Sequence, residues 1–82
     1  MENFETYMYE LGLARILTPA QNCWEAEHDC PPPRGWETAW ELHSHSDTVS
    51  GCPLTEEVVL GEDLSGYWRE GPAGPQLILL YH

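Results

Sequence analysis

The sequence predicts an α+β fold in which an N-terminal helix packs on a small antiparallel sheet of three to five strands. Three observations predict it. Apolar residues recur at three- and four-residue spacing near the N-terminus, large apolar and polar residues alternate in the middle of the chain, and the last residues form an apolar run. These patterns are typical of an amphipathic helix, a half-buried strand and a central strand. A chain of 82 residues is expected to form one domain, residues 1–82.

The helix is predicted from Asn3 to about Leu17. Its apolar face would comprise Phe4, Tyr7, Met8, Leu11 and Ala14. Gly12 lies inside this pattern and costs roughly 1 kcal/mol relative to alanine. A helix that stops early, with residues 13–17 continuing as extended chain, is therefore the alternative.

Residues 18–29 allow two interpretations. The segment Thr18–Gln21 has the form of a capping box and predicts the start of a short helix. Beyond it, Glu25, Glu27 and Asp29 alternate with apolar or aromatic residues, which slightly favours a strand. A strand would place the three acids on one face at intervals of roughly 6 to 7 Å, similar to phosphates along a nucleic-acid strand. A helix would turn Glu27 away from the other two.

The clearest strand pattern runs from Gly35 to Ser46, after a stiff loop that contains three consecutive prolines. One face of this strand would carry Trp36, Thr38, Trp40 and Leu42, and the other Glu37, Ala39, Glu41, His43 and His45. The pattern predicts a ribbon that buries tryptophan on one side and presents carboxylates to water on the other.

Three further strands are expected in the C-terminal half. They are Glu56–Leu60, Tyr67–Arg69 and Gln76–His82, separated by the acidic turn Gly61–Gly66 and by the glycine- and proline-rich loop Glu70–Pro75. The last strand is apolar on both faces, which indicates a central position in the sheet.

The charge of the chain is strongly one-sided. Fourteen Asp and Glu face three Arg and no Lys, giving a formal net charge of −11. Such a surface repels nucleic acid and attracts basic protein surfaces, so we expect a basic DNA- or RNA-binding protein as partner and no direct nucleic-acid contact. No apolar run is long enough to cross a membrane and no signal peptide is recognisable, which predicts a cytoplasmic location. An odd number of cysteines, three, fits reduced thiols.

No pattern in the sequence indicates an enzyme or a cofactor. Nucleophile, phosphate-loop and calcium-loop signatures are absent. A zinc site is the nearest alternative, with Cys23, His28, Cys30 and Cys52 as ligands, but their spacing fits no standard ligand pair. A small zinc-stabilised or structural interaction module, whose acidity serves solubility, is therefore the second interpretation.

The acids are the candidate binding residues. If residues 22–29 form a strand, Glu25, Glu27 and Asp29 join Glu37 and Glu41 in a two-strand acidic face. If those residues are helical, that face is broken and the acidic turn containing Glu62 and Asp63 becomes the better site.

In size, absence of lysine, single-domain character and aromatic content, the chain resembles small acidic phage-encoded inhibitors of bacterial defence, especially anti-CRISPR proteins that act as DNA mimics. The resemblance implies an inhibitor that occupies the basic nucleic-acid-binding surface of a defence complex, such as a CRISPR effector, in the host cytosol. These families share no diagnostic motif, so the binding residues named above come from charge alone.

Overall fold

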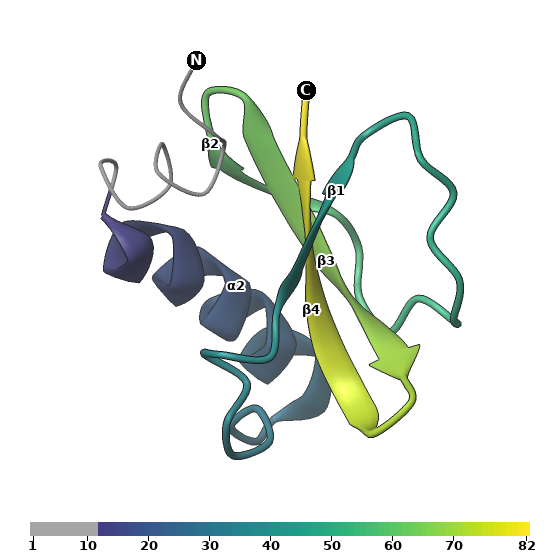
Figure 1. The fold of residues 1–82 in the computed structure, drawn as a ribbon. Coiled ribbons are helices and arrows are strands. Elements are labelled where there is room, and N and C mark those ends of the chain that lie inside the picture. Colours follow the sequence, from purple (N-terminus) through teal and green to yellow (C-terminus); the bar gives the residue numbers. More distant parts are fainter. Residues whose placement is uncertain (1–11) are drawn as a thin grey trace.

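The structure, a computed structural model, describes residues 12–82 and contains helix α2 and a four-stranded sheet in this part of the chain (Figure 1). The elements are α2 (Leu13–His28), β1 (Glu41–Ser44), β2 (Val58–Gly61), β3 (Leu64–Gly71) and β4 (Gly74–Tyr81). The helix packs on one face of the sheet, against β2 and β3. The α+β arrangement expected from the sequence is confirmed. Most of the predicted N-terminal helix lies outside the described residues.

The sheet has the strand order β1-β4-β3-β2. Strands β2, β3 and β4 pair in antiparallel fashion, as predicted, whereas β1 runs parallel to β4, so the sheet is mixed. The apolar C-terminal strand is central, because β4 lies between β1 and β3. Strand β3 is longer than predicted: Glu62 and Asp63 alone form the turn before it, and Pro72 and Ala73 form the turn after it.

The prediction that residues 22–29 form a strand is wrong. Helix α2 continues without interruption to His28, and residues 13–17 are helical rather than extended. The helix buries Ile16, Ala20 and Trp24, which recur every four residues and lie against the sheet. This helical period extends over the whole segment and prevails over the short two-residue alternation within it.

The predicted capping box is also wrong, because it lies in the helix interior. The Thr18 hydroxyl donates to the carbonyl oxygen of Ala14 at 2.8 Å instead of capping a new helix. Pro19 is accommodated inside α2. The helix ends at Asp29, which is left-handed (φ 54°) and whose N–H donates to the Glu25 carbonyl oxygen at 2.8 Å.

The predicted ribbon at residues 35–46 is a strand only over β1. Residues 33–39 form successive turns, in which Trp36 N–H donates to the Pro33 carbonyl and Ala39 N–H to the Trp36 carbonyl. Gly35 has a φ of 86°, a conformation that breaks an extended strand. Trp36 is nevertheless buried, as expected, because the turns direct its side chain into the core.

Trp68 is at the centre of the core, between α2 and the sheet. It is fully buried, and its indole N–H donates to the Ala20 carbonyl oxygen of α2 at 2.9 Å. The rings of Trp24 and Trp36 lie 5.0 and 5.5 Å from it, in tilted contacts typical of aromatic pairs. The core is completed by Leu64, Leu77 and Leu79.

The other face of the sheet carries polar side chains, among them Ser65 and Arg69, beside the buried apolar residues Ile78 and Leu80. Because neighbouring residues of a strand point in opposite directions, Arg69 points away from the helix that Trp68 contacts. The segment after β1 crosses the sheet and pairs with the edge of β3 that does not face β4. There Glu70 N–H donates to the Cys52 carbonyl and Leu54 N–H donates to the Trp68 carbonyl. Within residues 12–82, no helix has the length and apolarity needed to cross a membrane.

Candidate functional site

The helix-end acids Glu25, Glu27 and Asp29 lie at the C-terminal end of α2. The predicted two-strand acidic face therefore does not form, because this segment is helical. Glu25 is half-buried and accepts a hydrogen bond from Gln21 Nε2 at 2.8 Å, whereas Glu27 and Asp29 are exposed. Two of the three carboxylates are thus fully presented to solvent at one end of the molecule.

The helix-end acids oppose the dipole of their own helix. The C-terminus of a helix carries partial negative charge, so an acid there is unfavourable by about 0.3–1 kcal/mol. The first turn of α2, where acids would be favourable, contains none, and the last turn has only His28 as a basic residue. The positions of Glu27 and Asp29 are therefore not explained by the stability of the helix.

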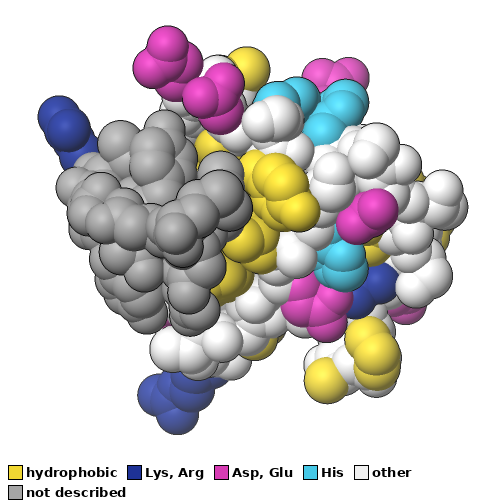
Figure 2. All heavy atoms as spheres, turned by 45° about the horizontal axis from the view of Figure 1, so that its top comes forward, with side chains coloured by type: hydrophobic (Ala, Val, Ile, Leu, Met, Phe, Trp, Pro, Cys, Tyr) yellow, Lys and Arg dark blue, Asp and Glu magenta, His cyan; other side chains and the backbone are white. Residues whose placement is uncertain are grey.

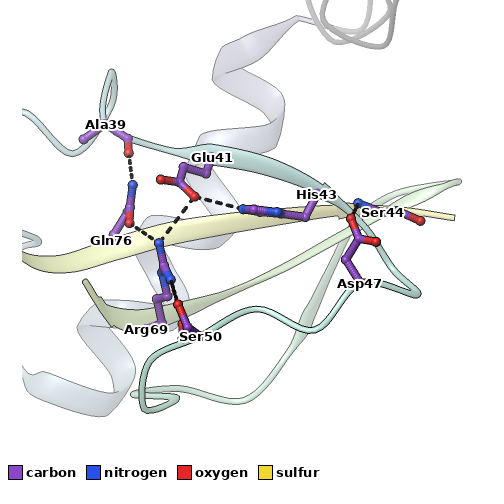
Figure 3. A network of polar contacts seen from close by, with 8 residues as sticks. All are labelled: Ala39, Glu41, His43, Ser44, Asp47, Ser50, Arg69 and Gln76. Carbon is purple, nitrogen blue, oxygen red and sulfur yellow. Dashed lines mark hydrogen bonds and ion pairs between the residues drawn. The ribbon is translucent and has the colours of Figure 1, made fainter. Parts of the chain in front are cut away.

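Glu37 and Glu41, assigned by sequence to the same strand face, have different surroundings. Glu37 is exposed in the turns that precede β1. Glu41 begins β1 and is held from two sides: His43 Nε2 lies 2.9 Å and Arg69 Nη2 3.3 Å from its Oε1 (Figure 3). Glu41 is therefore part of an internal network.

Arg69 is the centre of this network and is almost fully buried. Its guanidinium group donates to the Ser50 carbonyl at 2.6 Å and to Gln76 Oε1 at 2.8 Å (Figure 3). Gln76 in turn donates to the Ala39 carbonyl at 2.8 Å. The network joins β1, β3, β4 and the segment that follows β1. The positive charge of Arg69 is therefore paired with Glu41 inside the protein.

The pKa of Glu41 lies below its ordinary value. The hydrogen bond with His43 is the main cause, and the positive charge of Arg69 adds to it, while desolvation acts in the opposite direction. Glu41 thus stays ionised to lower pH than a free glutamate.

The hairpin acids Glu62 and Asp63 form the exposed turn between β2 and β3. In Figure 1 this turn and the C-terminal end of α2 lie at opposite ends of the molecule. On the face drawn in Figure 2, acidic side chains are separated by apolar and uncharged areas, with histidines among them. On this face the carboxylates therefore form separate groups.

Most of the negative charge is uncompensated. Among residues 12–82, ion pairs involve only two acids, Glu41 with Arg69 and His43, and Glu57 with His45. The exposed arginines, Arg15 and Arg34, have no ion-pair partner in this part of the chain. The helix-end acids and the hairpin acids therefore contribute their full charge to the surface potential.

The zinc ligands considered from the sequence do not come together. Cys23 is half-buried on α2, the ring of His28 stacks on Trp24 at 3.7 Å, and Cys30 and Cys52 are exposed. Within residues 12–82, the side chains that converge as possible metal ligands are instead His45, Glu57 and His82. Their distant positions in the sequence carry no ligand-spacing signal, and only the strand register brings them together.

A cleft of about 350 Å³ lies between the turns at Pro33–Trp36 and the loop at Pro72–Gln76. Glu41 is the carboxylate in its lining, and the neighbouring surfaces are mainly prolines, glycines and Trp36. Among residues 12–82, no histidine, cysteine, serine or second carboxylate lines the cleft beside Glu41. It therefore offers neither an acid–base pair nor an activated nucleophile.

Comparison with protein-family models, with curated proteins and with solved structures finds no match for this chain.

Proposed function

We propose that this protein is a non-enzymatic inhibitor that binds the basic nucleic-acid-binding surface of another protein in place of DNA. The observation that carries the proposal is the position of the helix-end acids. These carboxylates have no ion-pair partner within residues 12–82 and lie where the helix dipole disfavours them. A charge that does not stabilise its own helix is available for a partner.

The physical basis is electrostatic complementarity. Arginines of a phosphate-binding groove form short, charge-assisted hydrogen bonds with carboxylates as they do with phosphates. The net charge of −11 attracts a basic surface from a distance and speeds association. The tryptophan core beneath α2 keeps Glu25 and Glu27 on a fixed backbone, so little conformational entropy is lost on binding.

The target class follows from the resemblance to phage-encoded inhibitors. We place the protein in the cytosol of a bacterial host and take a CRISPR effector as the first target to test. The helix-end acids, with Glu37 as the next exposed acid along the chain, are assigned to the interface. The hairpin acids, which the sequence favours when residues 22–29 are helical, lie at the opposite end of the molecule; no helix dipole opposes their charge, so they are assigned to the free surface.

The test is a competition experiment. Purified CRISPR effectors and other DNA-binding defence enzymes are mixed with labelled duplex DNA, and the anisotropy of the DNA is followed as this protein is added. We expect at least one effector to release its DNA, and excess unlabelled DNA to reverse the inhibition. Retention of DNA by every member of the panel would contradict the proposal.

Two charge reversals locate the interface. The Glu27→Lys variant should weaken inhibition by about tenfold or more, because it places a cation against a basic surface. The matched control is Glu62→Lys, which makes the same change at the far end and should inhibit as well as the parent. If Glu62→Lys is the weaker inhibitor, the hairpin acids form the interface instead.

A further inference from the structure

The His–Glu cluster comprises His45, Glu57 and His82, three side chains from separate parts of the chain. His45 follows β1, Glu57 precedes β2 and His82 follows β4. His45 Nε2 lies 3.6 Å from Glu57 Oε2, and the rings of the two histidines are 4.1 Å apart. One possible ligand atom from each of the three residues lies within 4.8 Å of the others.

The backbone of both histidines is fixed by hydrogen bonds that extend the sheet. His45 N–H donates to the Tyr81 carbonyl at 2.9 Å, and His82 N–H donates to the Asp63 carbonyl at 3.0 Å. The parallel pairing of β1 with β4 brings these two segments side by side. The two imidazoles thus start from anchored backbone positions, and their ligand atoms lie within 4.8 Å of each other and of a Glu57 oxygen.

Ser65 contacts two members of the cluster, Glu57 and His82. It is buried, and its hydroxyl donates to Glu57 Oε2 at 2.7 Å. Since the single hydroxyl proton is used in that bond, the 3.1 Å contact between Ser65 Oγ and His82 Nε2 requires the imidazole to donate. The proton of neutral His82 is then on Nε2, which leaves the lone pair of Nδ1 free. A ligand histidine whose other nitrogen donates to an oxygen is the usual outer-shell arrangement of metal sites.

The chemistry of the three side chains selects the metal. Two imidazoles and one carboxylate form a known three-ligand set for zinc that leaves a fourth position open, whereas calcium and magnesium prefer oxygen ligands alone. Zinc bonds of about 2.0–2.2 Å bring tetrahedral ligand atoms to roughly 3.3 Å from one another. The side chains of His45 and Glu57 are about half exposed (49% and 43%), so they are free to rotate through the remaining distance. The negative surface also concentrates cations around the molecule.

We infer that His45, Glu57 and His82 bind a zinc ion, with the fourth coordination position open to water or to a ligand atom of another molecule. This site uses none of the cysteines considered from the sequence, and it does not depend on the proposed inhibitor function. It joins β1, the start of β2 and the end of β4, so an occupied site links both edges of the sheet to the inner strand β4.

The test is a zinc titration of the whole protein after removal of metal with a chelator. Calorimetry should show one equivalent of zinc bound, and the melting temperature should rise with zinc concentration because the ion binds the folded state. Replacing zinc by cobalt(II) gives an absorption spectrum that reports the ligands. The spectrum expected for this site lacks the intense thiolate-to-cobalt charge-transfer band that cysteine ligands produce.

Variants separate this site from general attraction of cations to an acidic surface. His45→Ala and His82→Ala should each weaken zinc binding by roughly tenfold or more, and Ser65→Ala by roughly tenfold through loss of its orienting bonds. The matched control is His43→Ala, because His43 also contacts a glutamate, Glu41 at 2.9 Å, and lies outside the His–Glu cluster. It should bind zinc as the parent does.

Circular dichroism of each variant without metal checks that the fold is intact, and His82→Gln replaces His82→Ala if the latter fails to fold. The inference is overturned if the parent binds no stoichiometric zinc or if His43→Ala weakens binding as much as His45→Ala. It is also overturned if the cobalt spectrum shows thiolate ligation.

Discussion

Glu41 is a surface acid whose carboxylate is held by two neighbours, His43 and Arg69. From the sequence it belongs to the outward, partner-binding side of a strand. In the structure its charge lies beside the buried guanidinium of Arg69, which would otherwise be a poorly compensated charge. The alternation of residues predicted that Glu41 faces away from the core, but it could not predict which cation of another strand would meet it.

The lowered pKa of Glu41 makes stability depend on pH in a defined direction. A carboxyl group with a lower pKa in the folded state stabilises the fold above its ordinary pKa of 4.5, and this contribution is lost as pH falls through the lowered value. The Glu41→Gln variant lacks this titration. Urea unfolding from neutral to acidic pH should show the difference in unfolding free energy between parent and variant shrinking below pH 4.5.

The control for this experiment is Glu37→Gln, which removes an exposed carboxylate from the turns before β1. A change in pH dependence as large as that of Glu41→Gln would show that the effect comes from removing any carboxylate and not from the contacts of Glu41. A difference between parent and Glu41→Gln that stays constant with pH would mean that the hydrogen bonds of Glu41 matter but its ionisation does not.

Trp68 is the residue on which the core depends most. Truncating a fully buried tryptophan costs about 3–5 kcal/mol, which is a large part of the stability of a small domain. We therefore expect Trp68→Ala to be largely unfolded by circular dichroism. Trp68→Phe should fold, with a loss of about 1–3 kcal/mol in urea unfolding, because the indole hydrogen bond to the Ala20 carbonyl is lost and the ring is smaller. A fully stable Trp68→Ala variant would contradict this account of the core.

At the scale of elements, helix α2 shows how two periodicities compete. A stretch of six residues, Trp24 to Asp29, alternates in the manner of a strand, while apolar residues from Ile16 to Trp24 repeat in the manner of a helix. The longer pattern decides the structure, because it buries one continuous face against the sheet. The sequence predicted one helix up to about Leu17 and the start of another at Thr18. Because Thr18 was interpreted as the cap of a new helix, the continuous helix Leu13–His28 was not predicted.

The acids at the end of α2 provide a test in which stability and binding change in opposite directions. Glu27→Lys replaces an unfavourable charge near the negative pole of the helix by a favourable one and should stabilise the protein by about 0.3–1 kcal/mol in urea unfolding. The same substitution is expected to weaken inhibition. Glu62→Lys, located in a turn, should show no dipole-dependent gain. A less stable Glu27→Lys variant would indicate an unrecognised role of Glu27 in the fold.

At the scale of the whole molecule, the charge of −11 sets the response to salt. Added salt screens repulsion among the uncompensated acids, so the melting temperature should rise with sodium chloride concentration at neutral pH. Binding to a basic partner should weaken over the same range. Differential scanning fluorimetry and the DNA-competition experiment measure the two effects, and a melting temperature that falls with salt would show that favourable ion pairs dominate.

The α+β class and the central position of the last strand were predictable, because they follow from patterns that are local in the sequence. The grouping of side chains was not. Contacts such as Ser65 with His82, or Arg69 with Ser50, depend on strand register and on the path of the segment after β1. Neither is encoded in local periodicity, so the charge of the protein was readable from the sequence but the arrangement of its sites was not.

The central strand of the sheet, β4, is also the last element that the ribosome synthesises among residues 12–82. Until residues 74–81 have left the exit tunnel, β1 and β3 have no common neighbour, and a nascent chain is limited to α2 and the β2–β3 hairpin. The sheet is therefore expected to form only once β4 is available to pair with β1 and β3. A chain shortened at Gly71 should lack a stable sheet and be rapidly degraded by cellular proteases.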